Sequence, residues 1–160
     1  MKLTVVYPAR AHSAYKIAAE KFSEFAMRVF GVSSMLITDE EFTGANDGDI
    51  TVLIGHDGEN DIAAELYLSK KTDSPGIRYC TDDYCIRSVT DGKNKYLWLA
   101  GGRPRSTIYA VYRYFELFCS CHANPYRWMR FPKCPMPILP ACRSRCRWRA
   151  SDISCPARWS

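Results

Sequence analysis

The chain has 160 residues, of which 47% are hydrophobic and 13% aromatic, and this fits one globular domain with a single core. The sequence contains neither a membrane-spanning stretch nor a signal-peptide core, so we expect no membrane contact and a cytoplasmic location. The net charge of +5 is unevenly distributed, with −2 on residues 1–120 and +7 on residues 121–160. The sequence therefore divides into two differently composed segments.

The N-terminal part of the chain begins with a strand and a helix. Residues 3–8 (LTVVYP) are β-branched and apolar, which is typical of a buried strand that ends at a proline. Apolar residues then recur at helical spacing over residues 13–30. We expect Ser13 to be the N-cap of this helix and Gly31 to end it in a left-handed conformation.

Two further strands and a short helix follow. Residues 33–38 and 49–55 are apolar and β-branched and predict strands, while the acidic residues between them indicate a solvated loop. Asn60 is expected to cap a short helix that runs through Leu68.

The last part of the predicted domain is a hairpin and a helix. Residues 83–89 and 96–101 predict two strands, and the intervening Asp91-Gly92 is a strong turn signal. A final helix runs from about residue 104 to 118. The order β-α-β-β-α-β-β-α predicts an α/β (α+β) two-layer sandwich, with a mixed sheet of about five strands and helices mainly on one face.

The junction between the last strand and the last helix is the candidate functional site. Backbone amides at a helix N-terminus attract anions, and glycine lets a phosphate approach closely. The candidate anion or interface contacts are Gly101, Gly102, Arg103, Arg105 and Ser106. However, the segment matches neither a P-loop nor a dinucleotide fingerprint. We favour a tight turn in which Pro104 presets the first helical φ and Ser106 or Thr107 caps the helix.

No other pattern is specific for catalysis or for a cofactor. His56, Asp57 and Glu59 could hold a metal, but a solvated loop is favoured because a metal site needs about three or four convergent ligands. Cys80 and Cys85 are interpreted as small apolar core residues. We expect no metal, no cofactor and no catalytic residue in this chain.

Residues 122–160 form a basic tail rich in Cys, Pro and Trp, which we expect to be irregular. One hypothesis is an arm that binds nucleic acid through Arg–phosphate contacts and Trp stacking. The other is a truncated or frame-shifted end of the coding sequence. We favour the second, because a basic arm rarely mixes so many Cys and Trp with its charges. Nucleic acid is therefore not the expected partner.

The strand–turn–helix element resembles the end of the N-terminal α/β domain that precedes the catalytic barrel in alpha-glucuronidases. The related domain of beta-N-acetylhexosaminidases is similar. The matching pattern is a strand ending in GG-x-P-x-(small)-T, followed by Tyr-Ala-Val-Tyr and an aromatic helix. It is carried here by Gly101, Gly102, Pro104, Thr107, Tyr109, Ala110, Val111, Tyr112 and Phe115. The resemblance covers residues 1–121.

The resemblance implies a non-catalytic accessory domain of a carbohydrate-active hydrolase, present here as a fragment. In that family the catalytic carboxylates lie in a (β/α)₈ barrel of about 250 residues, for which this chain has no room. The expected partner is that missing barrel, with carbohydrate as a further candidate. Two alternatives stay open: a small nucleic-acid-binding protein that uses the tail, and anion or phosphate handling at the Gly101–Ser106 turn.

Overall fold

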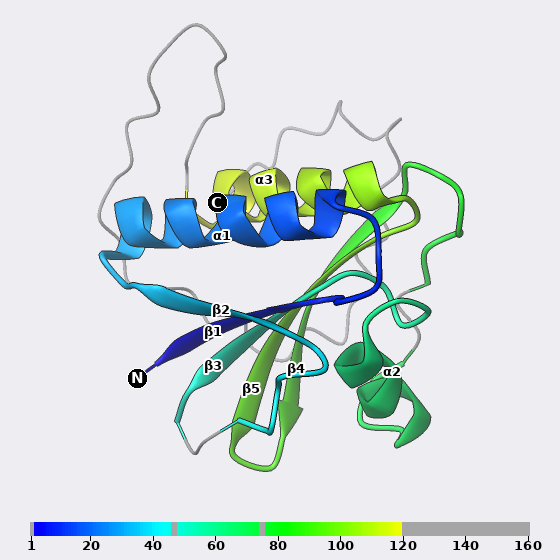
Figure 1. The fold of residues 1–160 in the computed structure, drawn as a ribbon, viewed down its shortest axis with the longest axis horizontal. Helices are drawn as coiled ribbons and strands as arrows, with labels where there is room; N and C mark the ends of the chain where they lie inside the picture. The colour runs from blue at the N-terminus through cyan, green and yellow to red at the C-terminus, as the bar shows by residue number, and fades with distance from the viewer. Residues whose placement is uncertain (1, 46–47, 74–75, 120–160) are drawn as a thin grey trace, which may run out of the picture.

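Five strands form one mixed sheet in the computed structural model, which describes residues 2–45, 48–73 and 76–119 (Figure 1). The spatial order of the strands is β2-β1-β3-β5-β4, and every neighbouring pair is parallel except β4 with β5. Their bounds are β1 (Leu3–Tyr7), β2 (Ser34–Thr38), β3 (Ile50–Ile54), β4 (Tyr84–Asp91) and β5 (Asn94–Gly101). The predicted mixed sheet is confirmed. The predicted tail lies outside the described residues.

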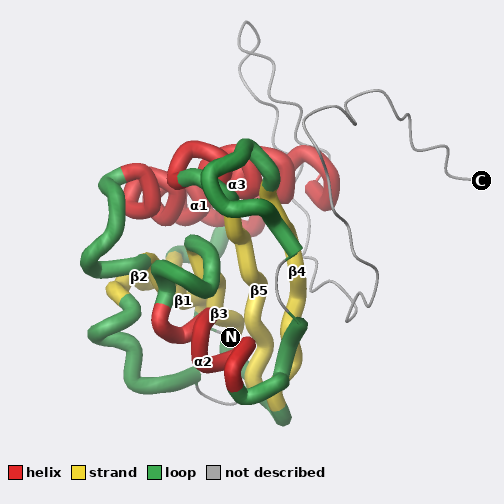
Figure 2. Tube along the Cα trace, turned by 90° about the vertical axis from the view of Figure 1, so that its right-hand side faces the viewer, coloured by secondary structure: helices red, strands yellow, loops and turns green. Residues whose placement is uncertain are grey.

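Two long helices, α1 (Ala14–Phe30) and α3 (Pro104–Cys119), lie side by side on one face of the sheet (Figures 1 and 2). Aromatic side chains join them: the rings of Phe22 and Phe115 lie 5.2 Å apart, as do those of Phe25 and Tyr112. Helical spacing in the sequence therefore identified the larger core correctly.

The short helix α2 (Asp61–Leu68) lies on the opposite face of the sheet. Its Ala63 and Leu66 pack with Trp98, which is fully buried and donates its Nε1–H to the Gly55 carbonyl at 2.7 Å. The helices thus lie mainly on one face, as predicted, with a smaller core on the other. Among the described residues, no helix is both long and apolar enough to cross a membrane.

The ends of α1 match the sequence only in part. Gly31 adopts φ +68° and its N–H bonds the Met27 carbonyl, so the predicted C-terminal cap is confirmed. Ser13 occupies the N-cap position, but its side chain makes no capping hydrogen bond. His12 replaces it, because its Nδ1 accepts the N–H of Ala14 at 3.1 Å.

The two predicted core cysteines differ from each other. Cys85 in β4 is buried, as expected, among the apolar side chains on the α2 side of the sheet. Cys80 is exposed and adopts φ +62°, so its prediction was wrong. The reason is local: Cys80 lies in a loop before β4, where its backbone N–H bonds the Gly102 carbonyl at 2.7 Å.

The hairpin prediction is confirmed at its turn. Asp91 pairs with Asn94 across the two-residue connection between β4 and β5. Gly92 adopts φ +60°, a conformation that favours glycine. This turn fixes the register of the one antiparallel pair.

Asn60 caps α2 and also ties it to the sheet. Its Oδ1 accepts the N–H groups of Ile62 and Ala63, both at 3.1 Å, and its Nδ2 donates to the Ile54 carbonyl at 3.0 Å. Asn60 is completely buried. One side chain therefore satisfies three backbone groups, and two of these bonds, those of Ala63 and Ile54, are buried.

Asn60→Ala is expected to lower the free energy of unfolding by about 2 kcal/mol, because it removes the cap and leaves a buried carbonyl unpaired. Urea unfolding followed by circular dichroism measures this. Asn60→Ser keeps a capping oxygen but cannot reach Ile54, so its loss should be intermediate. Equal stabilities for wild type and Asn60→Ala would contradict the prediction.

Candidate functional site at the carboxyl edge of the sheet

The carboxyl ends of β1, β2, β3 and β5 meet at one edge of the sheet, because these strands are parallel. In open α/β sheets, ligands bind beyond this edge at the topological switch point, where successive strands are placed on opposite sides of the first one. In this sheet the switch point lies between β1 and β3. The segments that follow these strands are residues 8–13, 39–41, 55–60 and 102–106, and the last of them includes the start of α3. The sequence-predicted site is the last of these together with Gly101, which ends β5.

Gly101 and Gly102 are required by close backbone packing. A Cβ on Gly101 would overlap the backbone of Ser106 and Thr107 in the first turn of α3. A Cβ on Gly102 would overlap the carbonyl oxygens of Arg78 and Thr81. The two glycines therefore let the strand end, the helix start and the loop before β4 come together, which confirms the tight turn.

The amides at this turn already have acceptors within the protein. The Gly102 N–H donates to the Asp83 carbonyl at 2.8 Å, and the Arg103 N–H donates to the Ser106 hydroxyl at 2.8 Å. The Ser106 hydroxyl in turn donates to the Arg103 carbonyl at 2.7 Å. Ser106 is the third residue of α3, so it closes the first turn by reaching back to Arg103 rather than from the predicted N-cap position, and Thr107 Oγ1 has no hydrogen-bond partner among the described residues. Anion binding here stays a prediction.

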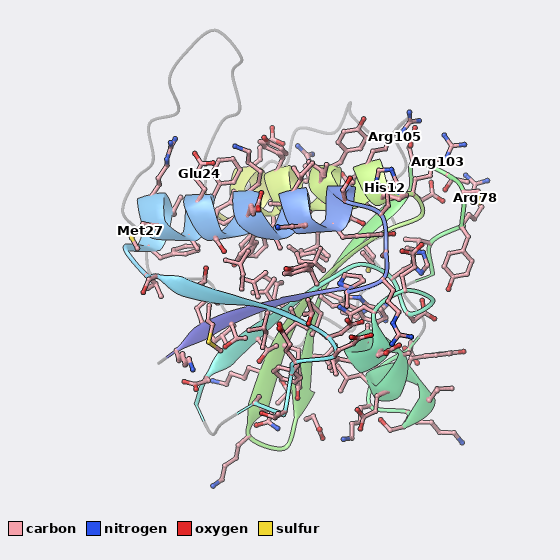
Figure 3. All side chains as sticks on the ribbon, in the orientation of Figure 1. His12, Glu24, Met27, Arg78, Arg103 and Arg105 are labelled. Carbon is pink, nitrogen blue, oxygen red and sulfur yellow. The ribbon has the colours of Figure 1, made fainter. Side chains whose placement is uncertain are left out.

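The arginines beside the turn are exposed, and two of them form ion pairs (Figure 3). Arg105 makes two hydrogen bonds to Asp82, at 2.8 and 2.7 Å, and Arg78 Nε lies 3.0 Å from Asp83 Oδ2. These contacts lower the pKa of both carboxyl groups. Within the described residues, the Arg103 side chain has no such partner.

Asp83 is expected to make the free energy of unfolding of the domain depend on pH in the acidic range. Its side chain is only 6% exposed, and a carboxylate with a lowered folded pKa stabilises the fold above its ordinary pKa of about 3.9. This stabilisation is lost as the pH falls through the folded pKa. Asp83→Asn should therefore be less stable than wild type at pH 7. Its free energy of unfolding should also fall less than that of wild type when the pH is lowered.

Urea midpoints measured at neutral pH and at about pH 3 test this expectation. The matched control is Asp82→Asn, because Asp82 also pairs with an arginine but is 36% exposed. Its effect should be smaller, since solvent screens an exposed pair. An identical acid response in wild type and Asp83→Asn would contradict the assignment.

The segment after β3, residues 55–60, contains His56, Asp57 and Glu59, which the sequence suggested as a weak candidate for a metal site. His56 Nδ1 accepts the Gly58 N–H at 2.9 Å, and burial lowers the pKa of this imidazole. Its Nε2 lies 3.7 Å from Glu59 Oε1. Asp57 instead accepts the hydroxyl of Tyr79 at 2.9 Å. Within the described residues, no three His, Cys, Asp or Glu side chains converge as metal ligands.

Two tyrosines complete this cluster, and the sequence analysis missed both. The Tyr79 ring lies 4.7 Å from that of His56, and partial burial together with the Asp57 hydrogen bond raises its pKa to about 12. Tyr15 is fully buried, and its hydroxyl has no hydrogen-bond partner in the described part of the chain. Burial raises the pKa of Tyr15, and the nearby Glu59 adds to the effect. The predicted apolar pattern did not include Tyr15, although Tyr15 lies three residues before Ala18 at the same helical spacing.

Asp39 contradicts the prediction that the acidic segment is a solvated loop. It is only 7% exposed and accepts three backbone N–H groups, from Ala9 at 2.8 Å and from Glu40 and Asp61 at 3.1 Å each. It therefore joins the loop after β1, the end of β2 and the start of α2. The reason is geometric. The parallel strands β1 and β3 end at the same edge of the sheet as β2, so the chain that follows them brings the amides of Ala9 and Asp61 to Asp39.

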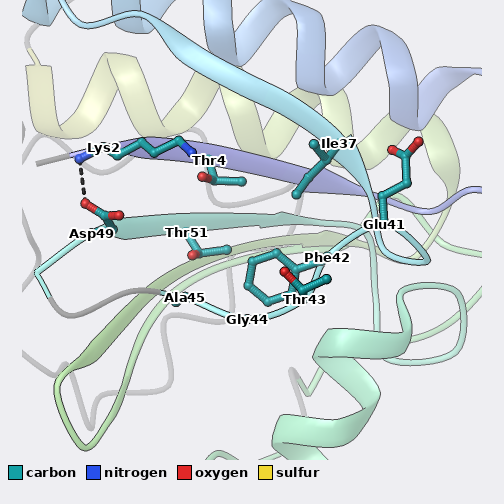
Figure 4. A pocket seen from close by; sticks show the side chains of 10 residues that line it. All are labelled: Lys2, Thr4, Ile37, Glu41, Phe42, Thr43, Gly44, Ala45, Asp49 and Thr51. Atoms are coloured by element: carbon teal, nitrogen blue, oxygen red, sulfur yellow. Dashed lines mark hydrogen bonds between the residues drawn. The ribbon is translucent and has the colours of Figure 1, made fainter.

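The face of the sheet that α2 covers holds two hollows, separated by residues 42–45. The smaller, of about 120 Å³, lies over Thr4 and Thr51 and is bounded by Phe42 (Figure 4). The larger, of about 300 Å³, lies between residues 42–45, α2 and the β4–β5 hairpin. The ion pair of Lys71 with Asp91, at 2.7 Å, lines the larger hollow.

Comparison with known proteins gives a fold relationship only. No family model and no curated protein matches the sequence. The fold is similar to part of BtGH115A, a family GH115 4-O-methyl-alpha-glucuronidase with specificity for decorated arabinogalactans, with a TM-score of 0.50 and 13% identity over 74% of this chain. It also matches CpGH84D, with a TM-score of 0.45 and 13% identity over 69% of this chain. The chain spans 14% of the first protein and 16% of the second.

Proposed function

We propose that residues 1–121 are a non-catalytic accessory domain of a carbohydrate-active glycoside hydrolase that resembles alpha-glucuronidase. In this proposal the domain packs against the catalytic barrel of the parent enzyme and borders the carbohydrate-binding cleft. The observation that carries the proposal is the fold similarity to a small part of an alpha-glucuronidase, together with the Gly-Gly turn that the sequence resemblance singled out.

The polar groups at the carboxyl edge support a structural role for this edge. Asp39 accepts three backbone amides, and Asp82 and Asp83 pair with arginines. Catalysis by a glycoside hydrolase needs two carboxyl groups that are free to face a sugar, roughly 5 to 10 Å apart. These three carboxylates are committed to holding loops in place.

Exposed aromatic and apolar side chains support the packing role. Tyr109 and Leu117 on α3 are 49% and 38% exposed, and Leu68 on α2 is 76% exposed. The three side chains do not form one patch, because α2 and α3 cover opposite faces of the sheet (Figures 1 and 2), and only the pair on α3 is assigned to the barrel. In the parent enzyme, these two side chains would cover apolar surface of the barrel.

The chain is expected to show no hydrolysis of aryl glycosides or of decorated arabinogalactan, the substrate class of the similar alpha-glucuronidase. The expectation follows because the barrel supplies the catalytic carboxylates. Assays of the full chain, beside an active alpha-glucuronidase as control, measure it. Turnover that Glu59→Gln abolishes would refute the proposal and assign catalysis to the cluster at the end of β3.

The coding DNA provides a positive test that does not depend on activity. Read beyond codon 119 in the other two frames, it is expected to encode a barrel with strands and helices in alternation. The absence of such a continuation in both frames would remove the support for a fragment of a hydrolase.

A further inference from the structure

The two edge strands of the sheet, β4 and β2, differ in how well side chains and loops cover their unpaired backbone groups. At the β4 edge, Arg87 donates to Thr72 Oγ1 at 3.3 Å and to the Asp73 carbonyl, and Lys71 pairs with Asp91. At the other edge, β2 pairs with β1 and with no other strand in the described part of the chain. Its sequence, SMLIT, contains no charge and no proline. Natural sheets usually block pairing at an exposed edge with charged residues, with proline or with a covering loop.

The outward backbone groups of β2 can be assigned from its hydrogen bonds. The Asp39 N–H donates to the Tyr7 carbonyl of β1 at 3.0 Å, so by alternation the amides of Ser34, Leu36 and Thr38 point away from β1. The Thr38 N–H indeed donates outward, to Glu41 Oε2 at 3.0 Å, and its carbonyl accepts the Glu41 N–H. Among the described residues, the N–H and carbonyl of Leu36 have no partner.

Apolar side chains flank this unpaired edge on both faces of the sheet. Leu36 is 36% exposed and is in register with Val5, which faces α1, whereas Met35 is 42% exposed and is in register with Thr4 on the opposite face. A strand added at this edge would satisfy the Leu36 backbone and cover both side chains. The edge therefore calls for an extended strand as its occupant.

We infer that this occupant is β2 of a second copy of the chain, paired antiparallel about a two-fold axis at Leu36. In that register Leu36 faces its own copy, Met35 faces Ile37, and Ser34 faces Thr38. Apolar side chains thus meet apolar ones, and hydroxyl side chains meet hydroxyl ones. The strand is complementary to itself.

Charge also favours the antiparallel arrangement. Glu40 and Glu41 follow the carboxyl end of β2. Arg28 lies in the last turn of α1, which precedes the amino end of β2. These charges are largely paired within each chain, because Glu40 lies 2.6 Å from Arg10 and Arg28 lies 2.7 Å from Glu24. The antiparallel arrangement is therefore favoured mainly because it separates the two copies of Glu41. Parallel pairing would instead bring Glu41 beside its own copy, and like charges directly opposite are destabilising.

Light scattering coupled to size-exclusion chromatography tests the inference on the full chain under reducing conditions. The expected mass is twice the 18.3 kDa of one chain. Leu36→Lys should give the single-chain mass, because it places two like charges at the axis. Tyr109→Lys, on the exposed surface of α3 away from β2, should remain dimeric and serves as the matched control. Circular dichroism confirms that each variant is folded.

Two further measurements address the backbone directly. Leu36→Pro removes the outward N–H together with the leucine side chain but leaves the backbone bonds to β1 in place, which an edge strand tolerates, and should also give the single-chain mass. In the wild type, exchange of the Leu36 amide should slow as protein concentration rises, whereas that of Thr38 should not change. A wild-type chain that stays monomeric, or a dimer that survives both Leu36 substitutions, would overturn the inference and leave the edge for a strand of another polypeptide.

Discussion

Gly102→Ala is expected to lower the free energy of unfolding by about 3 kcal/mol or more. The added Cβ would overlap the Arg78 carbonyl oxygen and lie 2.9 Å from that of Thr81, and both are backbone atoms that no rotamer change can move. Relief requires the loop before β4 to shift, which breaks the bonds from Cys80 N–H to Gly102 and from Gly102 N–H to Asp83. Urea unfolding followed by far-UV circular dichroism measures the loss.

Gly92→Ala is the matched control, because it separates steric overlap from backbone strain. Gly92 adopts φ +60° and has no heavy atom within 4 Å of an added Cβ. Its replacement should therefore cost only about 1 kcal/mol, from the left-handed backbone. If Gly102→Ala costs no more than Gly92→Ala, the turn does not depend on close packing.

Local patterns predicted most of the fold, because each element carries its own signal. The β-branched runs gave the strands of the sheet, and helical spacing gave the buried face of α1, including Phe22 and Phe25. The turn signal at Gly92 gave the hairpin. In α3 the same helical spacing predicted burial of Ile108, Val111, Tyr112, Phe115 and Phe118, and the side chain of Phe118 lies outside the described part of the structure. Tyr114 is also fully buried in α3, although this pattern did not include it.

Features that depend on distant segments could not be predicted in the same way. Asp39 is buried because amides 30 and 22 residues away come to it in the fold, and its acidic neighbours made it look solvated. Cys80 is exposed because its loop is bonded to the Gly102 carbonyl, and nothing near it in the sequence indicates that contact. Tertiary partners, rather than residue type, decide both outcomes.

The same distinction applies to the candidate site. The sequence identified the Gly-Gly turn, since glycine, proline and a capping serine stand next to one another. It could not show that Asp82 holds Arg105, because that ion pair joins residues 23 positions apart. The cluster of His56 with Tyr79 depends in the same way on two separate loops.

Asp39→Ala is expected to lower the free energy of unfolding by about 3 kcal/mol. The substitution leaves the N–H groups of Ala9, Glu40 and Asp61 without their acceptor, and an unsatisfied buried donor costs about 1–3 kcal/mol, less where water can enter. The loss should be accompanied by faster amide exchange at Ala9 and Asp61, which are 30 and 22 residues away in sequence. Hydrogen exchange measured by NMR resolves these positions.

Glu41→Ala provides the comparison, because Glu41 accepts one backbone N–H, that of Thr38, at the surface. Water can replace its carboxylate, so the loss should stay below about 1 kcal/mol. Asp39→Asn keeps one acceptor oxygen and should fall between the two. This order follows from how many amides each side chain satisfies and whether water can reach them. Equal effects for Asp39→Ala and Glu41→Ala would show that Asp39 does not hold the three loops together.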